Sequence, residues 1–220
     1  MKSAITLALA AQTCRAALPI IYRGDVDVNT YRANQQAEYP GFFGYPGSVQ
    51  ADWACGAGLI GDRYAITAAH CFFGAGAPAV GFTAHIAGDD YTVDEIRINN
   101  CYDNDNLDDN NSDIAILVLN SAVTGAVTYD LYDPDVSGTE VGETLEIVGI
   151  GAYGTIGSLE GDLNNDGLFH RGENVIEGFY QTNMIETIVN SGADGGLALE
   201  ASTASGDSGS PAFIVVGFTP

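Results

Sequence analysis

The chain has 220 residues, of which 46% are hydrophobic and 28 are glycine, and it carries 29 acidic against 7 basic residues for a net charge of −22. This length and apolar content suffice for one large or two small domains with a buried core. The charge argues against nucleic acid as a partner, because few basic groups are present to neutralise phosphates. Such a surface stays soluble by self-repulsion and suits a salt-rich medium; the alternative is the acidic bias of an ordinary secreted protein.

The first segment has the features of an export signal. Lys2 precedes an apolar stretch from Ala4 to Ala11, and the surrounding small residues suit cleavage. We therefore predict a signal peptide over residues 1–16 and a secreted protein. The later apolar runs are strand-sized and too short to cross a membrane, so we expect no membrane partner.

The rest of the chain has the pattern of β-strands. Short apolar runs, among them YAIT at 64–67, DIAILVL at 113–119 and LEIVGI at 145–150, are separated by Gly, Asn and Asp. Runs of this length bounded by turn residues are typical of strands. The sequence predicts an all-β fold.

Four cysteines fit an oxidising compartment. Cys55 and Cys71 bracket GAGLIGDRYAITAAH, which has the pattern of strand, turn and strand, so a disulfide between them would close one hairpin-sized loop. We predict that pair. Cys14 and Cys101 either pair with each other, or Cys14 leaves with the signal and Cys101 is a free thiol.

Two motifs in the first half place a histidine and an aspartate at the ends of apolar strands. In ITAAHC, residues 66–71, an apolar strand ends at His70. In NNSDIAILVL, Asp113 opens an apolar run, where an acid can be desolvated and can orient a partner. Either residue alone would usually be structural, as a lone core histidine or a strand-capping aspartate.

A third motif, DLNNDGLFHRGE at 162–173, fits the spacing of a calcium-binding loop with Gly167 at its sharp turn. The ligands would be Asp162, Asn164, Asp166, the carbonyl of Leu168, and Glu173. No strong amphipathic helix flanks this stretch. The alternative is a polar surface loop, since turns are rich in Asn, Asp and Gly.

The fourth motif is GDSGSP at 206–211, in which glycines flank Ser208. Glycine lets the backbone turn tightly, leaves the hydroxyl accessible and allows backbone N–H groups to converge. An α/β-hydrolase would need G-x-S-x-G, which fails at Ser210, and would place its serine before its histidine. That class is therefore excluded.

Together, in the order His70, Asp113 and Ser208, these motifs resemble those of the trypsin-like (chymotrypsin-fold) serine peptidases. The likeness covers residues 51–213 and includes CGAGLI at 55–60, where the family has a Cys-Gly-Gly-Ser-Leu-Ile strand. It implies two antiparallel β-barrels packed face to face within a domain of residues 17–220. The first barrel would cover about 40–120, the connection 121–135 and the second barrel about 136–220, with the active site between them.

The residue types indicate acyl transfer to water without a required cofactor. Ser208 would be the nucleophile, His70 its general base and Asp113 the group that orients the imidazole. The backbone N–H groups of Gly206 and Ser208 would form the oxyanion hole. The resemblance further implies that Ser202, six residues before the nucleophile, lies at the base of the specificity pocket, where it offers no countercharge for Arg or Lys.

Activation leaves alternatives open. In digestive members of the family a freshly cut N-terminus pairs with the Asp beside the serine, here Asp207. Ile20 and Ile21 are candidate new termini, and Arg15 and Arg23 are candidate cut sites, but neither set fits the family's pattern well. The alternative is an internal donor to Asp207, as the resemblance to secreted bacterial relatives implies. Ser210 is also more typical of those bacterial relatives.

We therefore predict a secreted serine endopeptidase, monomeric, with protein or peptide substrates. The alternative is an inactive serine-peptidase homologue that acts only by binding. PAFIVVGFTP supplies about one strand after the nucleophile, where the family has several, so we expect a C-terminally truncated chain with an incomplete second barrel and an open strand edge.

Overall fold

The structure is a computed structural model that describes residues 5–8, 20–46, 54–74, 76–103, 112–132, 140–155, 164–180, 184–190, 192–203 and 206–215. The strands are β1 Ile5–Ala8, β2 Ile20–Tyr22, β3 Phe42–Pro46, β4 Ala54–Gly61, β5 Tyr64–Thr67, β6 Thr83–Ile86, β7 Asp89–Ile98, β8 Ala115–Leu119, β9 Asp130–Leu131, β10 Thr144–Gly149, β11 Tyr153–Thr155, β12 His170–Val175, β13 Gly178–Tyr180, β14 Met184–Glu186, β15 Ala201–Ser202 and β16 Ala212–Val215. The helices are short: α1 Gln35–Glu38 and the 3-10 turns η1 Val28–Tyr31, η2 Ala69–Phe72 and η5 Gly192–Asp194.

This content confirms the all-β prediction. The three apolar runs singled out in the sequence form β5, β8 and β10. None of the helices in the described ranges is long and apolar enough to span a membrane.

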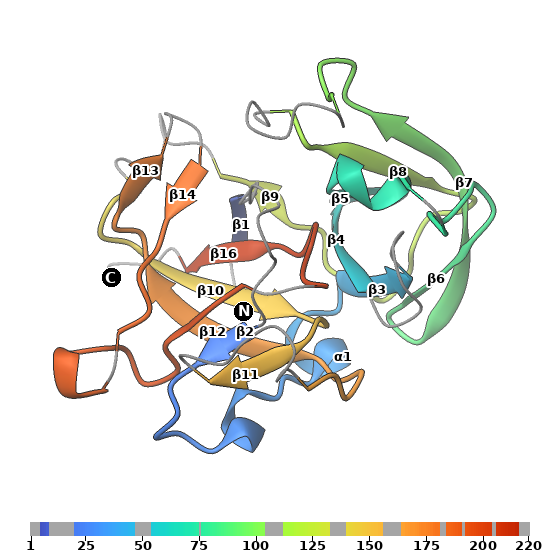
Figure 1. Ribbon diagram of the computed structural model, residues 1–220. Coiled ribbons are helices and arrows are strands. Elements are labelled where there is room, and N and C mark those ends of the chain that lie inside the picture. The colour runs from blue at the N-terminus through green and yellow to red at the C-terminus, as the bar shows by residue number, and fades with distance from the viewer. Residues whose placement is uncertain are drawn as a thin grey trace, which may run out of the picture.

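The first half of the fold is one six-stranded sheet in the order β3-β4-β5-β8-β7-β6. Its outer strands β3 and β6 lie next to each other, so the sheet curls into a nearly closed barrel (Figure 1). Alternate side chains along each strand point inward. They fill the barrel with a core that includes Phe43, Leu59, Ile86 and Leu117.

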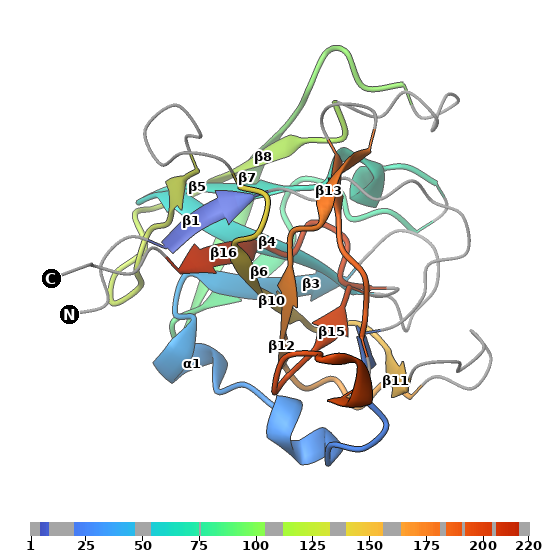
Figure 2. The ribbon, with the colours of Figure 1, turned by 90° about the vertical axis from the view of Figure 1, so that its left-hand side faces the viewer.

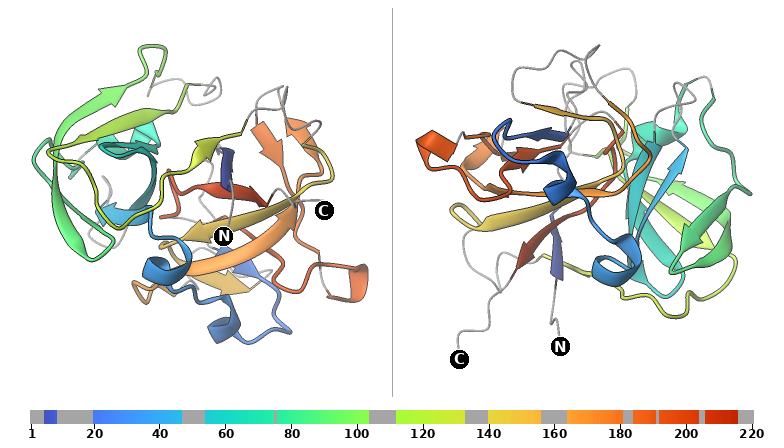
Figure 3. Two further views of the ribbon diagram at one scale, coloured as in Figure 1. Left: turned by 180° about the vertical axis from the view of Figure 1, so that it is seen from behind. Right: turned by 90° about the horizontal axis from the view of Figure 1, so that it is seen from below.

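The second half consists of several sheets. The largest has the order β12-β10-β16-β1-β9, a three-stranded sheet has the order β11-β2-β15, and β13 and β14 form a hairpin. Most pairings are antiparallel, but β1 with β9 and β11 with β2 are parallel. Figure 3 shows this half beside the six-stranded barrel.

Strand β1 bears on two of the sequence predictions. It comes from the segment predicted as a signal peptide, and in the intact chain it pairs antiparallel with β16, Ile5 opposite Val215 (Figure 2). β16 also pairs with β10, so the edge that we expected to be open is covered here. The signal peptide itself stays a prediction.

The two halves meet through a shared apolar cluster. Ile66 of β5 packs with Val148 of β10 and Phe213 of β16, and all three are buried. Burying apolar surface from both halves stabilises their packing by about 25 cal/mol per Å². This contact places the end of β5, which leads to His70, close to the segment before β16, which carries Ser208.

Candidate active site

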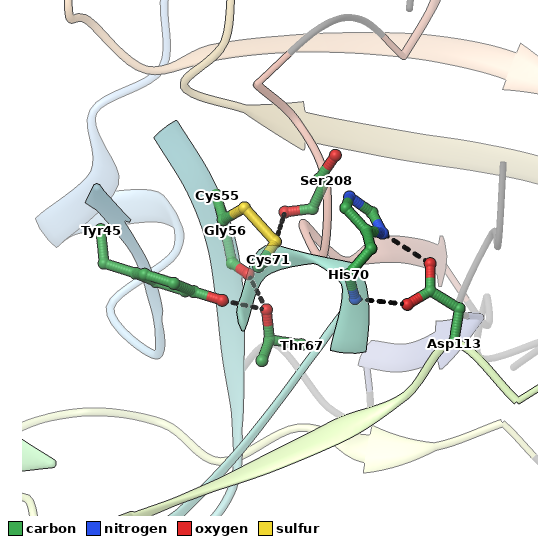
Figure 4. The surroundings of a disulfide bond; sticks show 8 residues. All are labelled: Tyr45, Cys55, Gly56, Thr67, His70, Cys71, Asp113 and Ser208. Atoms are coloured by element: carbon green, nitrogen blue, oxygen red, sulfur yellow. Dashed lines mark hydrogen bonds and ion pairs between the residues drawn. A yellow bond between two sulfur atoms is a disulfide. The ribbon is translucent and has the colours of Figure 1, made fainter. Parts of the chain in front are cut away.

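His70 and Asp113 are paired at the end of the first barrel. His70 lies in η2, the element after β5, and Asp113 lies two residues before β8, the neighbour of β5. The imidazole Nδ1 lies 2.6 Å from Asp113 Oδ2, and the His70 backbone N–H donates to Oδ1 at 2.8 Å (Figure 4). The residues predicted as base and orienting acid are therefore brought together.

This pairing sets the state of the imidazole. Asp113 is only 3% exposed, and a carboxylate can only accept, so Nδ1 carries the proton that is shared with Oδ2. In the neutral imidazole, Nε2 is then the ring nitrogen without a proton. The arrangement holds the histidine in the tautomer that a general base needs.

Ser208 lies in a tight turn between β15 and β16. Gly206 at φ +90° and Gly209 at φ +75° adopt left-handed conformations that glycine favours, and the Ser210 N–H donates to the Asp207 carbonyl at 2.8 Å. The Ser208 carbonyl accepts from the Gly56 N–H at 2.7 Å. Figure 4 shows the imidazole of His70 between Ser208 and Asp113.

Gly206 and Ser208, the residues predicted for the oxyanion hole, thus lie in the same turn. Asp207, between them, is buried, and its Oδ1 accepts from the Gly151 N–H at 2.9 Å. A Cβ on Gly149 would stand 1.9 Å from that oxygen, so the carboxylate fits a space that only glycine leaves open. An internal donor to Asp207 is therefore present in the intact chain.

The disulfide prediction is confirmed. Cys55 of β4 and Cys71 of η2 are bonded, and the Cys71 sulfur lies 3.9 Å from the Ser208 carbonyl oxygen. The bond fastens the histidine-bearing turn to the strand that contacts the nucleophile turn. Cys101 is exposed and forms no disulfide with a described cysteine, and Cys14 lies outside the described residues.

Ser202, predicted to line the specificity pocket, lies half-buried in β15, paired with Ile21. Ile20 and Ile21 are therefore within a three-stranded sheet, and the Ile20 N–H donates to the Ala152 carbonyl at 2.9 Å. Arg23, a candidate cut site, donates to the Leu197 carbonyl at 2.7 Å. In the intact chain neither candidate terminus is free.

The candidate calcium ligands that the structure describes have other partners or lie on different faces. Asp162 lies outside the described residues, and Asn164 pairs through its backbone with Tyr153. Asp166 binds Arg32 at 3.3 Å and accepts from the Leu168 N–H at 3.0 Å.

Glu173 lies in β12 at an odd step from His170, so its side chain points to the opposite face of the strand, whereas Asp166 lies 3.7 Å from His170 Nε2. Among the described residues, no group of three or more His, Cys, Asp or Glu side chains has a metal-binding arrangement.

Sequence reasoning missed two residues behind this site. Tyr45 of β3 and Thr67 of β5 are buried and bonded to each other at 2.7 Å, next to Gly56 (Figure 4). Burial is the main reason that the pKa of the Tyr45 phenol is raised, so it stays a neutral donor. The available signal was the hydroxyl of Thr67 within an otherwise apolar strand, three residues before His70.

A family model described as Trypsin matches residues 27–218, which is most of the chain. The chain belongs to the trypsin family. This membership agrees with the barrel, the residue order and the predicted resemblance.

Solved structures share the trypsin-family fold. The chain is similar to neuropsin, a serine protease expressed in the limbic system of mouse brain, with 22% identity and a TM-score of 0.58 over 83% of this chain and 81% of that one. It is also similar to a protein called HBP, with 19% identity and a TM-score of 0.57 over 86% of this chain and 83% of that one. At these identities the likeness shows the fold alone. A search of curated protein sequences found no significant match.

Proposed function

We propose that the protein is a secreted serine endopeptidase. The observation that carries this proposal is the buried Asp113 carboxylate bonded to both the ring and the backbone of His70, with Ser208 on the other side of the imidazole (Figure 4). The disulfide near the site supports an oxidising, extracellular compartment.

In the proposed reaction the Ser208 hydroxyl oxygen attacks the carbonyl carbon of a peptide bond while its proton passes to His70 Nε2. The Gly206 and Ser208 N–H groups stabilise the negative oxygen of the tetrahedral intermediate. His70 then gives the proton to the amine, which departs. The acyl group remains bonded to Ser208 as an acyl-enzyme. A water molecule, deprotonated by His70, attacks the acyl carbon and releases the acid and the free Ser208 hydroxyl.

Asp113 contributes by stabilising the imidazolium that forms in each step, without taking up the proton itself. The reaction needs no cofactor. Substrates are proteins or peptides, and Ser202, which has no negative charge, disfavours cleavage after Arg or Lys. We propose a monomer that acts without nucleic acid or membrane partners.

Fluorophosphonate labelling tests the proposal, because the reagent forms a covalent bond only with an activated serine. We expect the native chain to be labelled and Ser208→Ala or His70→Ala to lose labelling and peptidase activity together, since each removes one half of the proton-transfer unit. Ser121→Ala, which removes an exposed serine hydroxyl, is the control and should label normally.

If folded native protein, checked by its melting curve, is neither labelled nor active, the endopeptidase assignment fails and the alternative of a binding-only homologue stands. Activity within about tenfold of the native level in Ser208→Ala would contradict the choice of nucleophile.

A further inference from the structure

Behind the nucleophile turn lies a buried chain of hydroxyl groups. Tyr45 is 3% exposed and Thr67 is fully buried. The Tyr45 hydroxyl lies 2.7 Å from Thr67 Oγ1, and Thr67 Oγ1 lies 2.7 Å from the Gly56 carbonyl oxygen (Figure 4). Neither side chain is among those that bear the proposed chemistry.

The direction of these hydrogen bonds follows from the groups present. A carbonyl oxygen can only accept, so Thr67 uses its one hydroxyl proton for Gly56. Tyr45 must then donate its proton to Thr67. The chain therefore runs from the Tyr45 hydroxyl through Thr67 to the Gly56 carbonyl, and both lengths are those of good O–H···O bonds.

Gly56 faces the nucleophile turn with its other polar group. Its N–H donates to the Ser208 carbonyl at 2.7 Å. A Cβ on Gly209 would stand 2.2 Å from Thr67 Oγ1 and 2.6 Å from the Gly56 oxygen, so the turn rests directly on the threonine. A displacement of the Thr67 hydroxyl would therefore move Gly56 and Gly209, and Ser208 with them.

Tyr45 also contacts the segment that carries His70. Its ring stacks on Phe72 of η2, with centroids 5.8 Å apart and planes 8° apart. Phe72 lies two residues after His70 in the same 3-10 turn. One tyrosine thus packs against the turn of the proposed base and bonds to the residue that supports the proposed nucleophile.

We propose that Thr67, held by Tyr45, is a positioning residue that fixes Ser208 relative to His70 across the junction of the two halves. The inference rests on the proposed function, because it concerns the geometry of that same site. A misplacement of about 1 Å at a reacting group costs roughly a hundredfold in rate, so small shifts of this support are measurable.

The test uses three variants in the full chain. Thr67→Val keeps the shape but removes the hydroxyl, Thr67→Ser keeps the hydroxyl, and Tyr45→Phe removes only the first donor. We expect fluorophosphonate labelling to slow by at least about tenfold in Thr67→Val, by less in Tyr45→Phe, and to stay within about threefold of native in Thr67→Ser. With a peptide substrate the loss should appear in kcat, with KM nearly unchanged.

Thr83→Val, an exposed threonine of β6 in the same barrel, is the matched control and should label at the native rate. All rates are compared well below each variant's melting temperature. Native labelling in folded Thr67→Val, or an equal loss in Thr67→Val and Thr67→Ser, would overturn the inference.

Amide hydrogen exchange tests the support without activity. The Gly56 N–H bonds to the nucleophile turn, whereas the Leu59 N–H of the same strand bonds to the Gly41 carbonyl. In Thr67→Val, release of the nucleophile turn should speed amide exchange at Gly56 by about tenfold and leave exchange at Leu59 unchanged. Global destabilisation would speed exchange at both amides. Unchanged exchange at Gly56, or equal acceleration at both amides, contradicts the positioning role.

This measurement separates the two proposals. If the native chain is not labelled at all, the proposed function fails, and exchange alone decides whether Thr67 holds the turn. If Thr67→Val does not fold, Tyr45→Phe decides, and native labelling together with native exchange at Gly56 in that variant overturns the inference.

Discussion

His70 and Asp113 are joined by two hydrogen bonds, one from the imidazole Nδ1 at 2.6 Å and one from the His70 backbone N–H at 2.8 Å. In Asp113→Asn only one oxygen remains. If this oxygen still accepts from the His70 backbone N–H, the new amide NH₂ faces Nδ1. Nδ1 must then accept a hydrogen bond, so the ring proton moves to Nε2. We expect kcat to fall by about ten-thousandfold with little change in melting temperature, measured by peptide hydrolysis and thermal unfolding.

The chain offers a matched control in His85 and Asp90, an exposed pair with its ring nitrogen 2.9 Å from the carboxylate. Asp90→Asn should leave kcat unchanged, because exposed pairs contribute little. A similar loss in both variants, or none in Asp113→Asn, would show that the buried pair does not set the tautomer.

The Cys55–Cys71 bond spans 16 residues of sequence. Replacing both with alanine should lower the free energy of unfolding by about 3 kcal/mol, because a loop of this size regains its conformational freedom when unfolded. Urea unfolding measures the loss, and Cys101→Ser, which changes an exposed cysteine that is bonded to no described cysteine, is the control. Equal stability of the double variant and the control would contradict this prediction.

Gly149→Ala should disturb the nucleophile turn through its contact with Asp207. The added methyl would stand 1.9 Å from Asp207 Oδ1, so the carboxylate or its strand must move, at about 1–3 kcal/mol of stability. We expect slower labelling of Ser208 as well. Gly24→Ala, whose methyl would meet only Thr155 at 3.7 Å, is the control, and indistinguishable behaviour of the two variants would refute the argument.

His170 should make stability depend on pH. It is 1% exposed, and its Nε2 lies 3.7 Å from Asp166 Oδ2. Burial lowers its pKa and the Arg32 charge adds to this, whereas the Asp166 carboxylate and the backbone of Leu168 oppose it.

Because the unfolded chain takes up this proton at about pH 6.5, before the folded one, stability falls as the pH drops from there towards the lowered pKa. His170→Phe should remove up to about 1.4 kcal/mol of that loss per pH unit. Urea unfolding at about pH 8 and about pH 5 measures it, with His85→Gln as an exposed control. A slope that is the same in His170→Phe and the native chain would exclude His170 as its source.

The loop at 162–173 leaves two alternatives that calcium removal separates. Asp166 is already held by Arg32 and the Leu168 N–H, so we expect EDTA to leave the melting temperature unchanged, as for a polar surface loop. A rise with calcium would indicate a site that binds the folded state. Loss of that rise in Asp162→Ala with Asp166→Ala would assign it to this loop.

Local pattern was sufficient for strands β5, β8 and β10, which the sequence singled out. YAIT became β5 because its apolar and β-branched residues suit a buried pleated strand. The contact of His70 with Asp113, 43 residues later, was not readable from either motif, because it depends on the pairing of β5 with β8. Only the joint order with GDSGSP indicated it.

Other features had little or no local signal. The run IIY at 20–22 suggested a new terminus, yet it is a strand between β11 and β15, whose residues come more than a hundred positions later. Thr67 looked like an ordinary β-branched residue of a strand. Its role appears only when Tyr45 and Gly56 are placed on the neighbouring strands.

The order of strands also bears on how the molecule is made. All six strands of the first barrel lie between Phe42 and Leu119, so that barrel can close while later residues are still being synthesised. The sheet that holds Ser202 must instead wait for Ile21–Tyr22 to meet Ala201–Ser202, a long-range closure that is intrinsically slow. On a nascent chain the histidine and aspartate would therefore be assembled well before the serine, and the proposed proteolytic capacity would arise only in the final folding step, which shields neighbouring chains during synthesis.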